Sequence, residues 1–254
     1  MNDPESLGQT PYLQTMRALL AKDWRLFRLP LSALVAVGLG CYPITVAAVL
    51  GGSEANAAYY LFNAAMLACE VTAVLASVFG GAALTGERAD HTADFLNTLP
   101  VTRSQIIVSK WMVCMIMVGA SLGLHSLVAL IFWRLETSGS RATLALPIWV
   151  QRAYGPAWSL AAYWESASAF AAACIISLFG VAWGLSAFTK SGPICACASI
   201  AVTIATVVLA KNGLGDPRLV GAWEAAYRLA LPPAAIGLSS LVAGTLYYLR
   251  RVAP

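Results

Sequence analysis

Long apolar segments recur along the whole 254-residue chain and restrict it to one class of fold. A helix needs about 20 apolar residues to cross the hydrocarbon core of a membrane, and six segments approach that length. They cover residues 29–50, 59–84, 111–133, 160–188, 193–210 and 231–249. Only 11% of the residues are charged, whereas soluble domains are about 25% charged. We therefore expect an all-α integral membrane protein with six transmembrane helices.

A basic amphipathic helix is predicted ahead of the first apolar segment, with Thr10 as its N-cap and Pro11 as its first residue. Its apolar stripe contains Leu13, Met16, Leu20, Trp24 and Phe27, and its other faces carry Arg17, Lys22, Arg25 and Arg28. Such a helix lies in the membrane interface. We assign residues 1–28 to a cytoplasmic N-terminus with an interfacial elbow helix, and residues 29–254 to the transmembrane domain.

The placement of Lys and Arg predicts the orientation of the chain. Of the 16 basic residues, ten fall on the side of the termini and six on the other side, and the first loop, 51–58, has none. Both termini are therefore expected in the cytoplasm, with the chain in the inner (plasma) membrane. Residues 1–22 show no cleavable signal peptide, so the first segment is expected to remain as a span.

The longest interior stretch that is incompatible with hydrocarbon covers residues 85–110 and includes six charged side chains: Glu87, Arg88, Asp90, Asp94, Arg103 and Lys110. Residues 87–98 are predicted to form a short amphipathic helix that Pro100 ends. Thr102 is expected to cap a second helix that continues into the third span. A push on the short helix would then move that span.

Two ionisable residues fall inside predicted spans. A charged carboxylate at the position of Glu70 costs about 2.5–3.5 kcal/mol. It should therefore face the bundle interior, a wet cavity or a partner, or be protonated. His125 is the best candidate partner within the chain. Two interpretations remain open: a polar site in a translocation path, or a hydrogen bond that locks two helices.

Several short motifs do not indicate an enzyme. Gly119 to Gly123 fits G-x-S-x-G and His125 follows, but the nucleophile elbow needs a strand–turn–helix context. Close helix packing through small residues explains this motif and Gly180-x-x-x-Gly184 better. The chain has no G-x-x-x-x-G-K-[ST] loop and should not hydrolyse ATP itself. Neither a metal site nor a nucleic-acid-binding surface is indicated, since Cys195-Ala196-Cys197 lacks zinc spacing.

The polar stretch resembles a known family. Glu87-Arg88, Phe95-Leu96-x-x-Leu99-Pro100-Val101-Thr102-Arg103 and Ser109-Lys110 are similar to the intracellular loop of ABC-2-type ABC transporter permeases. The elbow helix, six spans and cytoplasmic termini agree with that family.

The resemblance implies a non-catalytic permease subunit, most often of an exporter, with a coupling helix in the loop at 85–110. That helix would dock on a separate ATPase subunit, and ATP and Mg would be bound there. The implied docking residues are Glu87, Arg88, Asp90, His91, Phe95, Leu96 and Arg103. Two ATPase copies and a second permease, either this chain or a homologue, would complete the transporter among membrane lipids. Residues 211–231 would include re-entrant helices.

Two other classes of function remain as alternatives. A stand-alone secondary transporter or channel would use a polar site at Glu70 and His125. An intramembrane hydrolase would use Ser121 and His125. The cargo of a transporter is left open by the sequence.

Overall fold

The computed structural model describes residues 10–50, 57–89, 101–138, 160–213 and 222–251, which form helices without any strand. The helices are α1 (Thr10–Leu50), α2 (Ala57–Ala89), α4 (Arg103–Ser138), α6 (Leu160–Ser186), α7 (Gly192–Gly213) and α8 (Ala222–Arg251). The predicted all-α class is confirmed for these residues.

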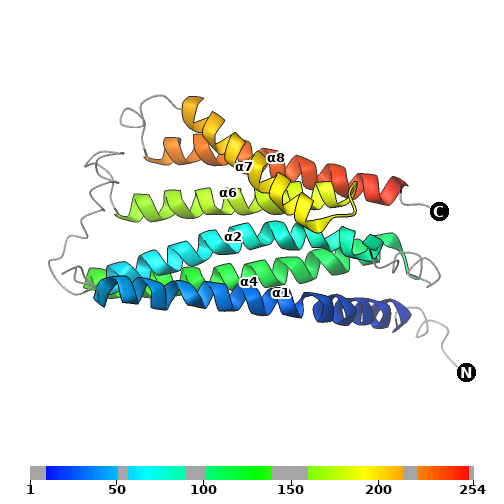
Figure 1. The fold of residues 1–254 in the computed structure, drawn as a ribbon, viewed down its shortest axis with the longest axis horizontal. Helices are drawn as coiled ribbons and strands as arrows, with labels where there is room; N and C mark the ends of the chain where they lie inside the picture. The colour runs from blue at the N-terminus through cyan, green and yellow to red at the C-terminus, as the bar shows by residue number, and fades with distance from the viewer. Residues whose placement is uncertain (1–9, 51–56, 90–100, 139–159, 214–221, 252–254) are drawn as a thin grey trace, which may run out of the picture.

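The helices form two layers, with α1, α2 and α4 in one and α6, α7 and α8 in the other (Figure 1). The layers meet mainly where α2 packs on α6 and α7. One end of the bundle holds the starts of α1, α4 and α7 and the ends of α2, α6 and α8 (Figure 1, right). Neighbours in sequence are therefore antiparallel, whereas α1 and α4 run in the same direction.

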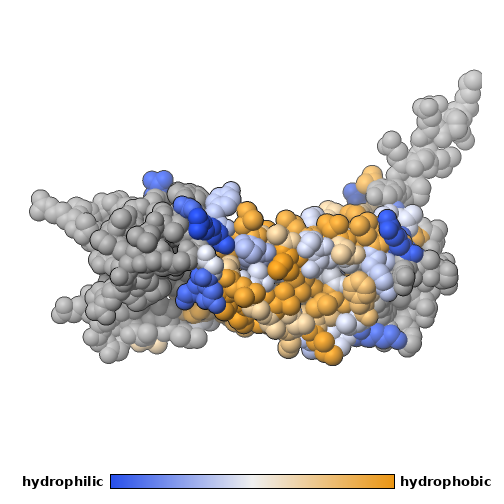
Figure 2. Space-filling model, turned by 90° about the horizontal axis from the view of Figure 1, so that it is seen from above, coloured by the Kyte–Doolittle hydropathy of each residue, from blue (hydrophilic) through white to orange (hydrophobic). Residues whose placement is uncertain are grey.

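On the face that Figure 2 shows, apolar residues cover the middle of the molecule and hydrophilic residues lie at both margins. Among the described residues, α2, α4, α6, α7 and α8 each contain a segment long and apolar enough to cross a membrane. The two parts of α1, Leu13–Leu29 and Leu31–Pro43, pass the same test together and meet at 43°. The chain is thus a multi-pass membrane protein.

The first helix joins the predicted elbow and the first apolar segment without a gap. It turns a narrow face towards the bundle, because Leu19, Asp23, Phe27, Leu34 and Gly38 are buried at spacings of four or seven residues. The predicted apolar stripe is therefore divided. Its members Leu20 and Phe27 pack against the core, whereas Leu13 and Trp24 are exposed.

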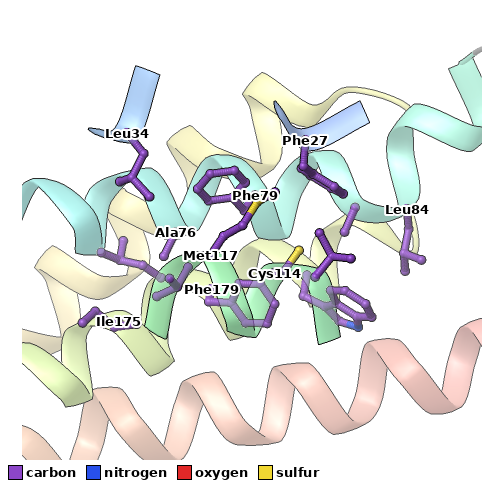
Figure 3. Close-up of a cluster of buried hydrophobic side chains, with 14 of the residues drawn as sticks. Phe27, Leu34, Ala76, Phe79, Leu84, Cys114, Met117, Ile175 and Phe179 are labelled. Carbon is purple, nitrogen blue, oxygen red and sulfur yellow. The ribbon is translucent and has the colours of Figure 1, made fainter. Parts of the chain in front are cut away.

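The hydrophobic core lies where four helices converge. Figure 3 shows Phe27 of α1, Phe79 of α2, Met117 of α4 and Phe179 of α6 gathered in one cluster. The rings of Phe27 and Phe79 lie 5.9 Å apart and tilted, an arrangement that favours aromatic pairs. Trp183 is fully buried, and its Nε1–H donates a hydrogen bond to Thr245 Oγ1 of α8 at 3.1 Å.

Glycines bring α6 and α8 into backbone contact. A Cβ built on Gly180 would lie 2.1 Å from the carbonyl oxygen of Gly237, and one on Gly244 would lie 2.6 Å from the Cα of Gly184. The predicted packing role of Gly180 and Gly184 is therefore confirmed. Among the described residues, Gly119 and Gly123 do not take part in such packing, because an added Cβ there would meet nothing within 4 Å.

A tight turn around Lys190 joins α6 to α7. The amides of Ala187, Phe188 and Thr189 bond back to carbonyls of Gly184 and Leu185. The start of α7 presses on α2, because a Cβ on Gly81 would lie 2.8 Å from the carbonyl oxygen of Gly192.

The last helix begins earlier than the sequence predicts. Residues 222–231 form the first turns of α8, and Pro232 and Pro233 lie inside this helix. The expectation of a separate re-entrant helix is therefore wrong for residues 222–231, while residues 214–221 are outside the described part. Neighbouring helices allow proline inside a membrane helix because they satisfy the freed backbone groups.

The glycine contact predicts a contrast between two alanine substitutions. Gly237→Ala should force α6 and α8 apart and destabilise the protein by about 1–3 kcal/mol. The control Gly119→Ala adds a methyl to open space and should be neutral or stabilise α4 by up to about 1 kcal/mol. Thermal unfolding of purified protein in one detergent measures both, and equal melting temperatures would contradict the close contact.

Candidate functional site

The end of the bundle with the polar stretch is the first candidate site. Glu87 and Arg88 belong to the end of α2, which reaches Ala89, rather than to a separate helix. Arg103 is the partly exposed first residue of α4. The predicted docking residues Asp90, His91, Phe95 and Leu96 fall in 90–100, outside the described residues.

A reciprocal pair of hydrogen bonds fixes where α4 begins. The Thr102 amide donates to Gln105 Oε1 at 2.8 Å, and the Gln105 amide donates to Thr102 Oγ1 at 3.3 Å. This capping box satisfies two backbone donors that a helix start otherwise leaves unpaired. The prediction that Thr102 caps the second helix is confirmed, and α4 continues from there into the membrane as one helix.

The start of α4 packs directly on the elbow part of α1. Leu19 and Ile106 are each only 5% exposed and form a small cluster with the partly buried Val101. Four residues further along α1, Asp23 meets the next turn of α4. Its Oδ2 accepts a hydrogen bond of 2.6 Å from Ser109 Oγ, and its Oδ1 lies 3.6 Å from Lys110 Nζ.

The residues of this polar junction are buried on both helices, α1 and α4. Asp23 is 1% exposed, Lys110 2% and Ser109 0%, and Asp23 Oδ1 has no hydrogen-bond partner among the described residues. Removing one partner of a buried ion pair costs about 3–5 kcal/mol, yet replacing the whole pair by apolar residues is often neutral or stabilising. Overall stability therefore does not explain why charges occupy these positions.

Sequence reasoning missed this junction. It treated Lys110 as a flanking positive charge and did not single out Asp23. One signal was present, because Asp23 is the only acidic residue in α1 and stands among four basic ones. An acid in a basic interfacial helix disfavours binding to anionic lipid unless it has a buried partner.

The second candidate site lies inside the membrane and involves His125. This side chain is 2% exposed, and its Nδ1 lies 3.0 Å from the hydroxyl of Tyr42 on α1. The two rings are stacked with centroids 5.9 Å apart. Gly38 makes room for them, since a Cβ there would lie 2.6 Å from His125 Nε2. His125 therefore connects α4 to α1.

Glu70 is not part of that contact. It is exposed on α2, on the same stripe as Leu67, Val74 and Val78. No hydrogen bond joins Glu70 to His125 in the described structure, where His125 contacts Tyr42 instead. The secondary-transporter alternative requires Glu70 and His125 to form one polar site, and the structure does not bring these two residues together.

Ser121 also joins helices rather than forming a catalytic centre. Its hydroxyl lies 2.9 Å from Thr72 Oγ1 of α2, and both side chains are buried within continuous helices. His125 is engaged with Tyr42. The strained turn that a nucleophile elbow needs is absent from α4, and the hydrolase alternative loses its support.

Comparison with known protein families matches residues 26–153, half of the chain, to the family described as ABC-2 family transporter protein. The chain belongs to the ABC-2 transporter family. Separate comparisons with curated proteins and with solved structures found no match.

The match covers most of the end of the bundle that carries the polar stretch, the first candidate site of this ABC-2 protein. It includes α2, the whole polar stretch and α4, but it begins three residues after Asp23. The resemblance that the residues 87–110 indicate is therefore confirmed at the level of the family.

The capping box predicts a local effect at the start of α4. Thr102→Ala should weaken this helix start by about 1 kcal/mol, so amides of residues 104–106 should exchange roughly fivefold faster with deuterium. Thr102→Ser keeps the hydroxyl acceptor and should exchange at the wild-type rate. Hydrogen–deuterium exchange with mass spectrometry measures both, and equal rates in the two variants would contradict the cap.

Proposed function

We propose that this protein is the permease subunit of an ABC exporter, which forms the translocation path and is driven by a separate ATPase subunit. The family membership carries the proposal. It is supported by the position of the polar stretch between α2 and α4, at the same end of the bundle as the starts of α1 and α7 and the end of α8 (Figure 1).

The complete membrane domain would contain six spans and an interfacial elbow. Five apolar helices and the bent α1 supply six candidates, and the elbow would be the part of α1 before the 43° bend. The excess of Lys and Arg at the end with the polar stretch supports a cytoplasmic location for that end and both termini. The chain would reside in the inner (plasma) membrane.

The polar stretch would be the docking site for the ATPase. Glu87, Arg88, Asp90, His91, Phe95, Leu96 and Arg103 would contact it, while ATP and Mg would be bound by the ATPase. Because α4 begins immediately after this stretch and runs unbroken through the apolar middle of the molecule, displacement of the stretch would be delivered along α4. Two ATPase copies would serve this permease and a second one, a copy or a homologue.

The exposed stripe of α2 would line the path between the two permeases. Leu67, Val74 and Val78 are each more than 40% exposed, and Glu70 lies among them. A carboxylate facing acyl chains is costly, so such residues usually face water or protein. A path formed between two permease subunits would give Glu70 that environment. His125, held by Tyr42 against Gly38, would serve packing rather than transport.

Docking is tested with the variant Glu87→Ala/Arg88→Ala. Charged contacts at the centre of an interface are worth about 2 kcal/mol or more, so capture of the ATPase should fall at least about tenfold. Capture is measured by affinity purification from native membranes. Mass spectrometry identifies a co-purified chain that carries a phosphate-binding loop, and an assay of ATP hydrolysis confirms its activity. The control Lys190→Ala removes an exposed cation from the α6–α7 turn at the same end. Unchanged capture by the double variant would refute the docking site.

The path is tested by the water access of Glu70→Cys. In a background without the exposed Cys197, a charged thiol reagent should label this cysteine in the assembled transporter, and Val74→Cys on the same stripe should also react. Thiols react as thiolates, which form in water and not among acyl chains. A Glu70→Cys protein that labels only after solubilisation and denaturation would place this stripe against lipid.

A further inference from the structure

The contacts between α1 and α4 follow one continuous seam. Leu19 meets Ile106, Asp23 meets Ser109 and Lys110, and Tyr42 meets His125. Positions on both helices increase together, because the helices run in the same direction. Leu34 and Met117 belong to the core cluster between the two polar ends of the seam. The seam therefore spans both sides of the 43° bend in α1.

Apolar contacts hold the elbow part of α1 to the bundle at Leu19 and Phe27, but they do not fix the register of the elbow on α4. The elbow part of α1 exposes most of its surface, and among its described residues only Leu19, Asp23 and Phe27 are fully buried. Leu19 and Ile106 form a cluster of two buried residues, which slides easily because apolar contacts are non-directional. A carboxylate that accepts a hydrogen bond from Ser109 and faces the Lys110 ammonium is directional and resists sliding.

The charges also restrict the possible registers. Shifting α1 by one turn relative to α4 would replace Asp23 opposite Lys110 by Leu19 or Phe27 and leave a buried ammonium without its carboxylate. Buried polar groups of this type are best attested as devices that fix register. This agrees with the observation that stability alone does not account for the pair.

We propose that Asp23 is a positioning residue for energy coupling: through Ser109 and Lys110 it fastens the elbow to the start of α4, so that both move as one body. The inference rests on the proposed function, because the motion is the one delivered by the ATPase to the stretch before α4. When the ATPase displaces the start of α4, the elbow then moves with α4. It is not a fixed anchor in the membrane interface.

The first test measures distances between spin labels by pulsed electron resonance in the transporter purified with its ATPase in lipid nanodiscs. Exposed positions allow labels at Arg25→Cys on the elbow, Ser104→Cys on α4 and Lys190→Cys on the turn of the other layer. Cys197 and the half-buried Cys174 are replaced by serine in this background. On exchanging ADP for ATP, the distance from 25 to 104 should stay constant while that from 25 to 190 changes. A change from 25 to 104 as large as that from 25 to 190 would overturn the proposal.

The second test removes the charges without leaving one unpaired. Asp23→Leu/Lys110→Met keeps the site filled and should reach the membrane at the wild-type level. Its distance distribution from 25 to 104 should broaden, and the ATP-dependent change from 25 to 190 should fall to less than a third. If this variant is not produced, Asp23→Asn/Lys110→Gln, which keeps an acceptor for Ser109 and removes both charges, is measured in its place with the same expectation. A wild-type response in the variant measured would show that the pair is only structural and refute the proposal.

The controls separate this proposal from the one it rests on. A wild-type chain that captures no ATPase and responds to neither nucleotide would refute the proposed function, and the elbow proposal with it. A wild-type chain that captures the ATPase and responds to ATP, while the apolar-pair variant responds equally, would refute the elbow proposal alone.

Discussion

The small side chains of α2 are the constraint on which the bundle depends. Its buried face is formed mainly of alanine, glycine, serine and threonine, so that α2 contacts α1, α4, α6 and α7 at once. Helices in lipid gain little from the hydrophobic effect and associate through close packing and short hydrogen bonds. Gly80 illustrates the consequence, because a Cβ there would lie 2.6 Å from the carbonyl oxygen of Phe179 on α6. The two layers are joined mainly through this helix.

The other helices differ in how tightly they are packed around α2. In the first layer, α1 is tied to α4 along the seam from Leu19 to His125. In the second layer, α6 and α8 share backbone contacts at Gly180 and Gly237. By contrast, α7 and α8 have only 28% and 17% of their apolar windows buried.

The sequence predicted what depends on hydropathy and local chemistry. The apolar segments located each of the described helices. The proline and threonine near the start of α4 located its cap, and residues 87–110 indicated the family. Contacts between helices were predicted less well. Gly119 and Gly180 occur in the same pattern, but only Gly180 meets a neighbour, because the pattern does not show which face of a helix is turned inward. Asp23 and Lys110 were missed for a related reason. They are far apart in the sequence, and their contact depends on α1 and α4 lying side by side in the same direction, which the sequence does not show. His125 was placed opposite Glu70 by chemistry alone, whereas Tyr42, an uncharged partner, holds it.

The short turn between α6 and α7 fixes the start of α7 against the bundle. The start of α7 is pinned at Gly192 against Gly81, and Thr189 Oγ1 lies 2.9 Å from Cys195 Sγ across the turn. Figure 1 shows α7 diverging from α6 as it leaves this end. A helix of 22 residues is about 33 Å long, so each degree of rotation about the turn moves its far end by about 0.6 Å. Any rotation about this turn would therefore produce its widest displacement at the opposite end of α7.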